Sequence, residues 1–275
     1  MSTVRVASTG TSMATTMGIT PMAMAMNTAP PNMDTAATAT DSPPRWDAVP
    51  PALRLAWLAS PALPIGAFSY SEGLESAVEH GLVRDEAGAT HWLAQQLALM
   101  ARGDLAAIAQ GLAAWRADDT AALAALHDWL RCSRDGAESR LQSEQTGQSL
   151  AVWLRGWAAQ DAPLAGRLAL LRTLGAPPPF ALVMALALAS IPLPDEALLS
   201  GCAFGWAENQ VQAALKVVPL GQSAGQRVLG HLAARIPAAV ATALATPPAQ
   251  RQLFAPMLSI LAARHETQYS RLFRS

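Results

Sequence analysis

The chain has 275 residues, of which 51% are hydrophobic and only 14% are charged, and its formal net charge is −1. A chain of this length can bury a sizeable core in one large domain or two small ones. The thin charged coat indicates surface that is hidden against partners. A near-neutral chain also lacks the basic stripe that nucleic-acid binding needs, so we expect no nucleic-acid partner.

Residues 1–47 are rich in Met, Thr, Ala and Pro, and they hold seven of the ten methionines. Few side chains there can support packing, so we expect a disordered extension at 1–47 before a single domain at 48–275. A signal peptide is not expected, because no continuous apolar stretch follows Arg5. One alternative is a thioether site for copper(I). Its ligands would be Met17, Met22, Met24, Met26 and Met33.

The sequence after Trp46 consists of Ala- and Leu-rich segments separated by Pro or Gly, with little of the alternation that strands require. This pattern predicts an all-α, single-domain bundle of about ten helices. The expected helices cover 51–59, 70–80, 85–102, 104–116, 119–132, 137–159, 163–174, 179–189, 195–217, 222–234 and 249–268. Within one of them, a buried stripe is expected from Leu93, Leu97, Met100 and Ala101.

The stretch LASPALPIGAFSYSEGLESAVEHG, residues 58–81, predicts a sharp turn followed by a helix. Gly66 allows a conformation that a side chain would resist, and Ser69 and Glu72 have the spacing of a capping box. Glu72, Glu75 and Glu79 then follow at spacings of three and four, so we expect them on one exposed face. That face is either a solvated surface that suits the helix dipole or an acidic docking surface.

The longest apolar run, from Phe180 to Ile191, has about twelve residues, fewer than the roughly 20 that cross a bilayer. It is typical of a buried helix, and we expect no membrane partner.

Cys132 and Cys202 form no CxxC pair, so neither a disulfide framework nor a cysteine zinc site is indicated. A reducing, cytoplasmic location fits this cysteine usage.

The stretch CAFGWAENQVQAALKVVPLGQSAGQRVL, residues 202–229, combines an apolar stripe with many amides. The stripe consists of Val211, Ala214, Leu215 and Val218. Unpaired buried polar groups cost on the order of 1–3 kcal/mol, so the amides need partners. They could form hydrogen bonds between helices, a polar groove for a partner, or a water-lined passage. The candidate residues are Glu208, Asn209, Gln212, Gln222 and Gln226.

No catalytic constellation is visible in the sequence. The only lysine, Lys216, follows Leu215 rather than a glycine, which excludes a Walker loop. The five histidines lack metal-ligand spacing, and each is expected at a helix end or on the surface. We therefore expect no catalytic residue, metal site or cofactor. The enzyme alternative is a helical hydrolase with a Glu208/His231 acid–base pair, although the sequence does not show that these side chains converge.

The chain closes with HETQYSRLFRS, an unusually aromatic and cationic C-terminal tail. Tails of this kind ordinarily fray. Tyr and Arg are enriched where interfaces lose water, so the tail either contacts a partner or folds back onto its own core.

Four segments, SPALPIGAFSYSEGLE, WAENQ, KVVPLGQSAGQR and HETQYSRLFRS, resemble in this order the signatures of the UreF family of urease accessory proteins. The resemblance implies an all-α, usually dimeric, non-enzymatic chaperone. Members of the family join the accessory protein UreD, also called UreH, and recruit and modulate the GTPase UreG. That complex supports lysine carbamylation and nickel insertion in the urease apoprotein, with nickel proposed to pass through internal tunnels.

The resemblance also implies partner-binding roles for particular residues. Glu72, Glu75 and Lys216 match segments tied to UreG engagement. The segment that the family associates with ordering upon UreD binding provides Tyr269, Arg271, Leu272, Phe273 and Arg274. An alternative is a stand-alone GTPase-activating protein that supplies an arginine such as Arg227 in trans.

Overall fold

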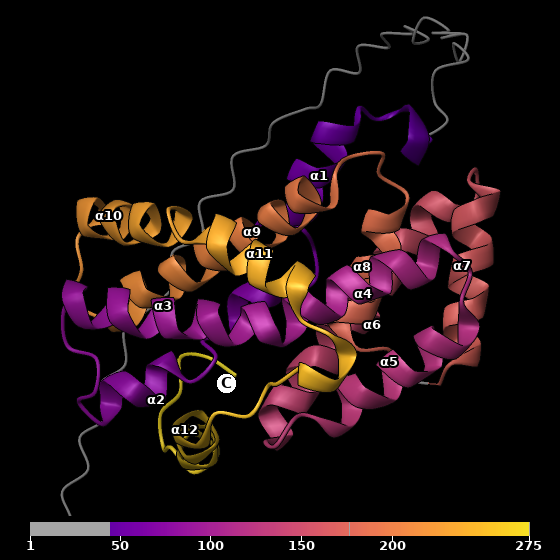
Figure 1. The fold of residues 1–275 in the computed structure, drawn as a ribbon. Coiled ribbons are helices and arrows are strands. Elements are labelled where there is room, and N and C mark those ends of the chain that lie inside the picture. The colour runs from indigo at the N-terminus through magenta and orange to yellow at the C-terminus, as the bar shows by residue number, and fades with distance from the viewer. Residues whose placement is uncertain (1–44, 176, 275) are drawn as a thin grey trace, which may run out of the picture. The chain divides into compact units, whose positions relative to one another are not determined.

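The structure is a computed structural model that describes residues 45–175 and 177–274 (Figure 1). These residues form helices and no strands, which confirms the all-α class. The five methionines of the copper alternative lie outside the described residues. The α-helices are α1 (Pro51–Ala59), α2 (Leu74–Glu79), α3 (Glu86–Arg102), α4 (Asp104–Arg116), α5 (Thr120–Cys132), α6 (Ala137–Ala158), α7 (Ala162–Thr173), α8 (Phe180–Ala189), α9 (Asp195–Val217), α10 (Gln222–Ala233), α11 (Ile236–Ala245) and α12 (Pro256–Glu266). Three short 3₁₀ helices accompany them, η1 (Trp46–Ala48), η2 (Ala67–Ser69) and η3 (Pro248–Gln250).

Most helix boundaries follow signals that are visible in the sequence. Asp85, Asp119 and Asp161 cap α3, α5 and α7, because each carboxylate accepts an amide hydrogen bond from three residues further on. Helix α11 was not predicted, since Pro237 suggested a break. This proline instead lies in the first helical turn, where its missing N–H has no intrahelical partner to lose. The expected helix at 249–268 is also divided, into η3 and α12.

Helix α8 lies at the centre of the main core. All residues from Ala181 to Leu188 are buried, and α4 and α6 pack against the helix. The expectation that this apolar run forms a buried helix is therefore confirmed. Gly111 and Gly147 allow this close packing: a Cβ on Gly111 would lie 2.7 Å from the Ala185 Cβ, and one on Gly147 would lie 2.8 Å from the Phe180 nitrogen.

A second hydrophobic cluster joins α2, α3, α9, α10 and α12. The long helix α9 contributes to both clusters, with Leu198 and Ala203 in the first and Ala207 and Val211 in the second. The predicted stripes agree with this packing. Leu93, Leu97 and Ala101 are buried on α3, as are Val211, Ala214 and Val218 around α9, while Met100 and Leu215 are half-buried.

Four tryptophans pack together where the described chain begins. Trp46 of η1, Trp57 of α1, and Trp153 and Trp157 of α6 all contact one another, with ring centroids 5.2–6.3 Å apart. The Trp46 side chain is fully buried. The folded part therefore includes residues before the expected boundary at residue 48.

Two stretches of the described chain, Glu86–Arg116 and Gln222–Ala245, are long and apolar enough to cross a membrane by length and composition alone. In the fold each stretch is divided into two helices, α3 with α4 and α10 with α11. All four helices pack against α9. Helices of a soluble core have the same length and composition.

Candidate functional site

The signature turn at residues 61–73 brings a carboxylate inward. Gly66 and Gly73 adopt left-handed backbone conformations, with φ of 75° and 83°, and Glu72 has a φ of 52°. Helix α2 begins at Leu74 rather than at about residue 70, so the predicted capping box does not form. The Ser71 hydroxyl instead accepts the amide hydrogen bond of Glu75, at 3.2 Å.

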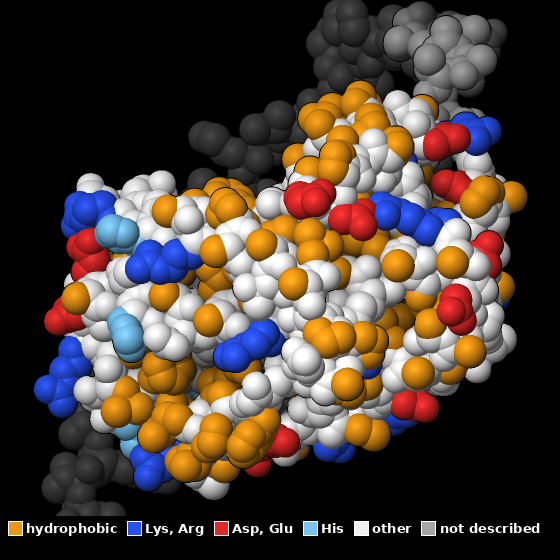
Figure 2. Space-filling model, in the orientation of Figure 1, with side chains coloured by type: hydrophobic (Ala, Val, Ile, Leu, Met, Phe, Trp, Pro, Cys, Tyr) orange, Lys and Arg blue, Asp and Glu red, His pale blue; other side chains and the backbone are white. Residues whose placement is uncertain are grey.

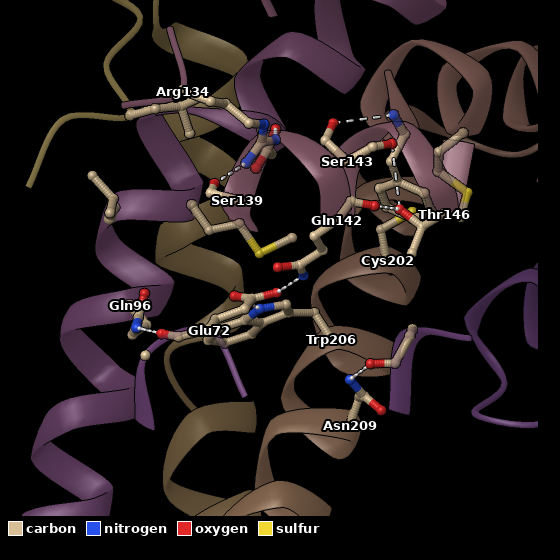
Figure 3. A pocket seen from close by; sticks show the side chains of 18 of the residues that line it. Glu72, Gln96, Arg134, Ser139, Gln142, Ser143, Thr146, Cys202, Trp206 and Asn209 are labelled. Carbon is tan, nitrogen blue, oxygen red and sulfur yellow. Dashed lines mark hydrogen bonds and ion pairs between the residues drawn. The ribbon is translucent and has the colours of Figure 1, made fainter. Parts of the chain in front are cut away.

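The Glu72 carboxylate lines a cavity of about 240 Å³. The indole Nε1 of Trp206 and the amide Nε2 of Gln142 each donate a hydrogen bond to it, both at 3.0 Å. Figure 3 shows the carboxylate between these two side chains. Burial raises the pKa of Glu72 above its ordinary value, and the two hydrogen bonds oppose that rise. The expectation that Glu72 lies on an exposed acidic face is therefore wrong.

Further polar groups fix the walls of this cavity. Gln96 donates to the backbone carbonyl of Glu72 at 2.8 Å, and Asn209 donates to that of Ala67 at 3.0 Å. Burial raises the pKa of the Cys202 thiol to about 12, so this wall carries a neutral, unreactive sulfur. Hydrogen bonds between α3, α6, α9 and the signature turn thus hold several polar groups in the wall of a cavity that apolar side chains otherwise largely line (Figure 3).

The predicted row of amides does not line this cavity as a set. Asn209 is its one member on the cavity wall. Gln212, Gln222 and Gln226 are exposed, and Glu208 is half-buried. Sequence reasoning missed Gln142 and Gln96, because they lie in helices far from the signature segments. A glutamine within an apolar helical stripe, as at Gln96, was the available signal.

The Glu75 carboxylate is buried beneath the C-terminal tail. One carboxylate oxygen accepts the backbone N–H of Leu272 at 2.7 Å, and the other accepts that of Phe273 at 2.9 Å. The Arg274 amide donates to the Ser69 carbonyl at 2.8 Å. Glu75 is therefore also wrongly predicted as an exposed acid, and Glu79 is the exposed acid of α2.

The tail is also held by charged and aromatic contacts. Arg271 pairs with Glu138 of α6 at 3.0 Å. The Lys216 ammonium lies 5.4 Å from the centroid of the Phe273 ring, a cation–π contact. Six of the predicted partner-binding residues thus meet at one site, namely Glu75, Lys216, Arg271, Leu272, Phe273 and Arg274. Of the two interpretations left open for the tail, the structure shows the folded-back one.

Exposed apolar side chains occur both in the docked tail and in the segment that includes α12. Tyr269 is fully exposed and Leu272 is 62% exposed, although Phe273 is buried. Phe254, Met257 and Ile260, on or just before α12, are also about half-exposed. Figure 2 shows hydrophobic side chains gathered over α12. We call these five exposed residues, Phe254, Met257, Ile260, Tyr269 and Leu272, the α12 patch.

One of the five histidines, His127, differs from the expectation of a helix end or a surface position, because it is buried in the interior of α5, whereas His265 lies in the last turn of α12. His127 and His265 are buried, whereas His80, His91 and His231 are exposed. No group of three acidic, histidine or cysteine side chains suited to a metal ion occurs among the residues that the structure describes. Glu208 and His231 share no hydrogen bond, and His231 lies near Glu86 on the outer surface of α10.

The fold and the site define an all-α helical-bundle protein whose signature segments build a docked tail and place the Glu72 carboxylate in the wall of a largely apolar cavity. The sequence model of the UreF family matches residues 83–233. The urease accessory proteins UreF of Paracidovorax citrulli, Methylibium petroleiphilum and Polaromonas sp. are 58%, 55% and 51% identical over 224 residues. The matches cover 81% of this chain and 88%, 93% and 94% of these relatives. The chain therefore belongs to the UreF family of urease accessory proteins.

Proposed function

We propose that this protein is a cytoplasmic, homodimeric scaffold that holds UreD through its C-terminal region and presents another surface to the GTPase UreG. In this role it supports nickel insertion into urease by positioning and regulating partners rather than by catalysing a reaction. The family supplies the identity of these partners. The contacts of the tail provide the structural support for the proposal.

The observation that carries the proposal is the α12 patch. Aromatic and large aliphatic side chains are enriched in the cores of protein interfaces. Leu272 is exposed where Glu75 accepts its backbone N–H and the Arg274 amide anchors the chain two residues later, so binding at Leu272 would cost little conformational entropy. Tyr269 is exposed three residues before it. Such an arrangement suits the capture of a partner protein.

The UreG surface is proposed in a form that differs from the acidic face expected at first. The carboxylates of Glu72 and Glu75 are engaged inside the protein and cannot contact a partner while the tail is docked. Lys216 is exposed at the edge of the tail, so it remains available. Glu72 and Glu75 would act indirectly, by supporting the signature turn and the tail.

The experiment that tests this proposal is co-purification of the full-length chain with UreD and UreG. Deletion of residues 265–275 is expected to abolish UreD capture, because it removes Tyr269 and Leu272. A variant with Leu82→Ala serves as a control, since Leu82 is another exposed leucine but lies outside the patch. Unchanged capture after the deletion would contradict the assigned role of the tail.

Urease maturation in cells that lack this protein provides the functional readout. Restored nickel content and activity on adding the full chain would support the scaffold role. A parallel chain lacking residues 1–47 measures what the extension contributes. Urease that matures equally well without the protein would refute the proposal.

A further inference from the structure

The buried histidine of α12 joins two carboxylates from different helices. His265 has no exposed surface, and its side chain lies between Glu75 of α2 and Glu138 of α6. Ring nitrogen Nε2 is 3.2 Å from Glu75 Oε2, and ring nitrogen Nδ1 is 2.9 Å from Glu138 Oε2. Because these nitrogens lie on different sides of the ring, the three groups cannot surround one metal ion.

The proton count at these contacts constrains the charge of the ring. An ionised carboxylate only accepts hydrogen bonds, whereas a neutral imidazole carries a single N–H. Two carboxylate contacts therefore need either a doubly protonated ring or a protonated carboxyl group. Glu75 already accepts two backbone amides, and Glu138 accepts Arg271, and both arrangements favour the ionised carboxylate. The proton therefore belongs on His265.

The charges in this cluster balance when the ring is an imidazolium. Glu75 and Glu138 contribute two negative charges, and His265 and Arg271 contribute two positive charges. Across the described chain, Glu75 and Glu138 are the charged groups that hydrogen-bond the ring. Lys216 on α9 faces the Phe273 ring instead. A neutral His265 would leave one negative charge uncompensated in a largely buried site, which is unfavourable.

We propose that His265 is a positioning residue for the C-terminal tail and acts in its charged form. Its two N–H groups hold Glu75 and Glu138 in the orientations in which Glu75 binds the amides of Leu272 and Phe273 and Glu138 binds Arg271. Loss of the ring proton removes one of these contacts. The carboxylate that is released turns toward water, and the tail residues that it holds are freed.

This inference rests on the proposed function only for its consequence in UreD binding. The tail that the imidazolium fixes carries Tyr269 and Leu272 of the α12 patch. Partner capture would therefore follow the protonation state of His265. The order of the tail can be measured on the isolated chain, so failure of the partner proposal and failure of this inference give different results.

The first test measures the charge of the ring directly. Nitrogen NMR of the full chain labelled with ¹⁵N-histidine distinguishes an imidazolium from a neutral ring, and the His265→Gln variant assigns the signal. With the tail docked, we expect both His265 nitrogens to carry protons, one toward each carboxylate. A neutral ring beneath a tail that remains protected from hydrogen exchange would overturn the inference.

The second test measures hydrogen exchange of the Leu272 and Phe273 amides, corrected for intrinsic exchange. As the pH is raised, protection should follow the protonation state of the ring seen by NMR. Where the ring of the unmodified chain is protonated, His265→Gln should speed this exchange by about tenfold or more, whereas His231→Gln, at an exposed position, should not change it. Equal protection in His265→Gln and the unmodified chain would overturn the inference.

A third variant separates charge from packing. In Glu138→Gln, the introduced amide can donate to a neutral Nδ1 while its oxygen still accepts from Arg271, and ring Nε2 can donate to Glu75. The neutral ring then satisfies every contact. We expect this variant to keep the tail ordered and to lose the pH dependence. Retention of the unmodified chain's pH dependence would show that the charge of His265 does not hold the tail.

Discussion

The indole of Trp206 donates a hydrogen bond to the carboxylate of Glu72 at 3.0 Å, across 134 positions of sequence. This bond joins the signature turn to α9 and helps to hold a non-glycine residue at a positive φ. Such a conformation costs of order 1 kcal/mol or more and persists only where surrounding contacts fix it. The signature segments SPALPIGAFSYSEGLE and WAENQ are distant in the chain, and this hydrogen bond joins them in the fold.

Glu72→Gln tests the cost of the buried charge. The folded-state pKa of Glu72 lies above its ordinary value, so the folded protein binds this proton more tightly than the unfolded chain does. Stability therefore falls as the pH rises through that interval. The uncharged amide should raise the free energy of unfolding at neutral pH, and the gain should vanish below the ordinary carboxyl pKa.

Urea denaturation followed by far-ultraviolet circular dichroism at several pH values measures this effect. Glu79→Gln is the control, because Glu79 is exposed on α2 and its substitution should leave the pH profile unchanged. A variant at Glu72 that is less stable than the unmodified chain at neutral pH would contradict the prediction.

Gly205→Ala should destabilise the contact between α1 and α9. A Cβ at this position would lie 3.0 Å from the Ala59 Cα and closer still to its carbonyl oxygen, and backbone atoms cannot move aside easily. We expect a loss of about 1–3 kcal/mol in the free energy of unfolding. Gly166→Ala in α7 has open space around it, so it should be neutral or stabilising by up to about 1 kcal/mol. Equal effects of the two substitutions would refute this packing argument.

Tyr269→Ala and Phe273→Ala should separate partner contact from tail docking. Tyr269 is fully exposed, so its removal should change stability by no more than about 0.5 kcal/mol. If it is a central interface residue, UreD affinity should fall about thirtyfold, as for a contact of about 2 kcal/mol. Phe273→Ala should also speed exchange of the tail amides, because that ring is buried. Tyr269→Ala with full UreD affinity would remove this residue from the proposed interface.

The two cysteines should differ in reactivity. Burial raises the pKa of the Cys202 thiol to about 12, so almost no thiolate forms near neutral pH, whereas Cys132 is exposed. Iodoacetamide should therefore modify Cys132 in the folded chain and reach Cys202 only after unfolding. Mass spectrometry of the alkylated peptides identifies each site, and rapid labelling of Cys202 in the folded protein would contradict the described burial.

Arg227→Ala tests the alternative of GTPase activation in trans. The guanidinium of Arg227 makes two hydrogen bonds to Glu86, at 2.8 and 2.6 Å, on the protein's own surface. This pairing explains the residue without a partner, so we expect the substitution to leave GTP turnover by UreG unchanged. A clear loss of that turnover in the assembled complex would favour the alternative.

Much of the helical fold could be predicted because apolar spacing and breaking residues are local signals. The buried stripes of α3 and α9 and the buried helix α8 followed directly from the sequence. Helix α11 was missed because a proline has opposite meanings inside a helix and in its first turn. Only neighbouring structure decides between these meanings at Pro237.

The site was less predictable, because its contacts connect residues that are far apart in the chain. The spacing of Glu72 and Glu75 indicated a solvated helix face. Glu72 instead contacts Trp206 and Gln142, 134 and 70 positions away, and Glu75 contacts His265, 190 positions away, so only tertiary packing brings these partners together. The signature segments pointed to the tail and to Lys216 separately, and they did not indicate that the two lie in contact. They also could not show that Glu75 holds the tail from beneath.

The tryptophan cluster has a consequence for optical measurements. Half of the eight tryptophans lie within it, with every ring against the other three. Half of the tryptophan emission therefore originates in the corner where η1, α1 and α6 meet. A titration in which a partner covers Tyr269 could leave that emission nearly silent, so a dye placed at the tail is the better reporter of assembly.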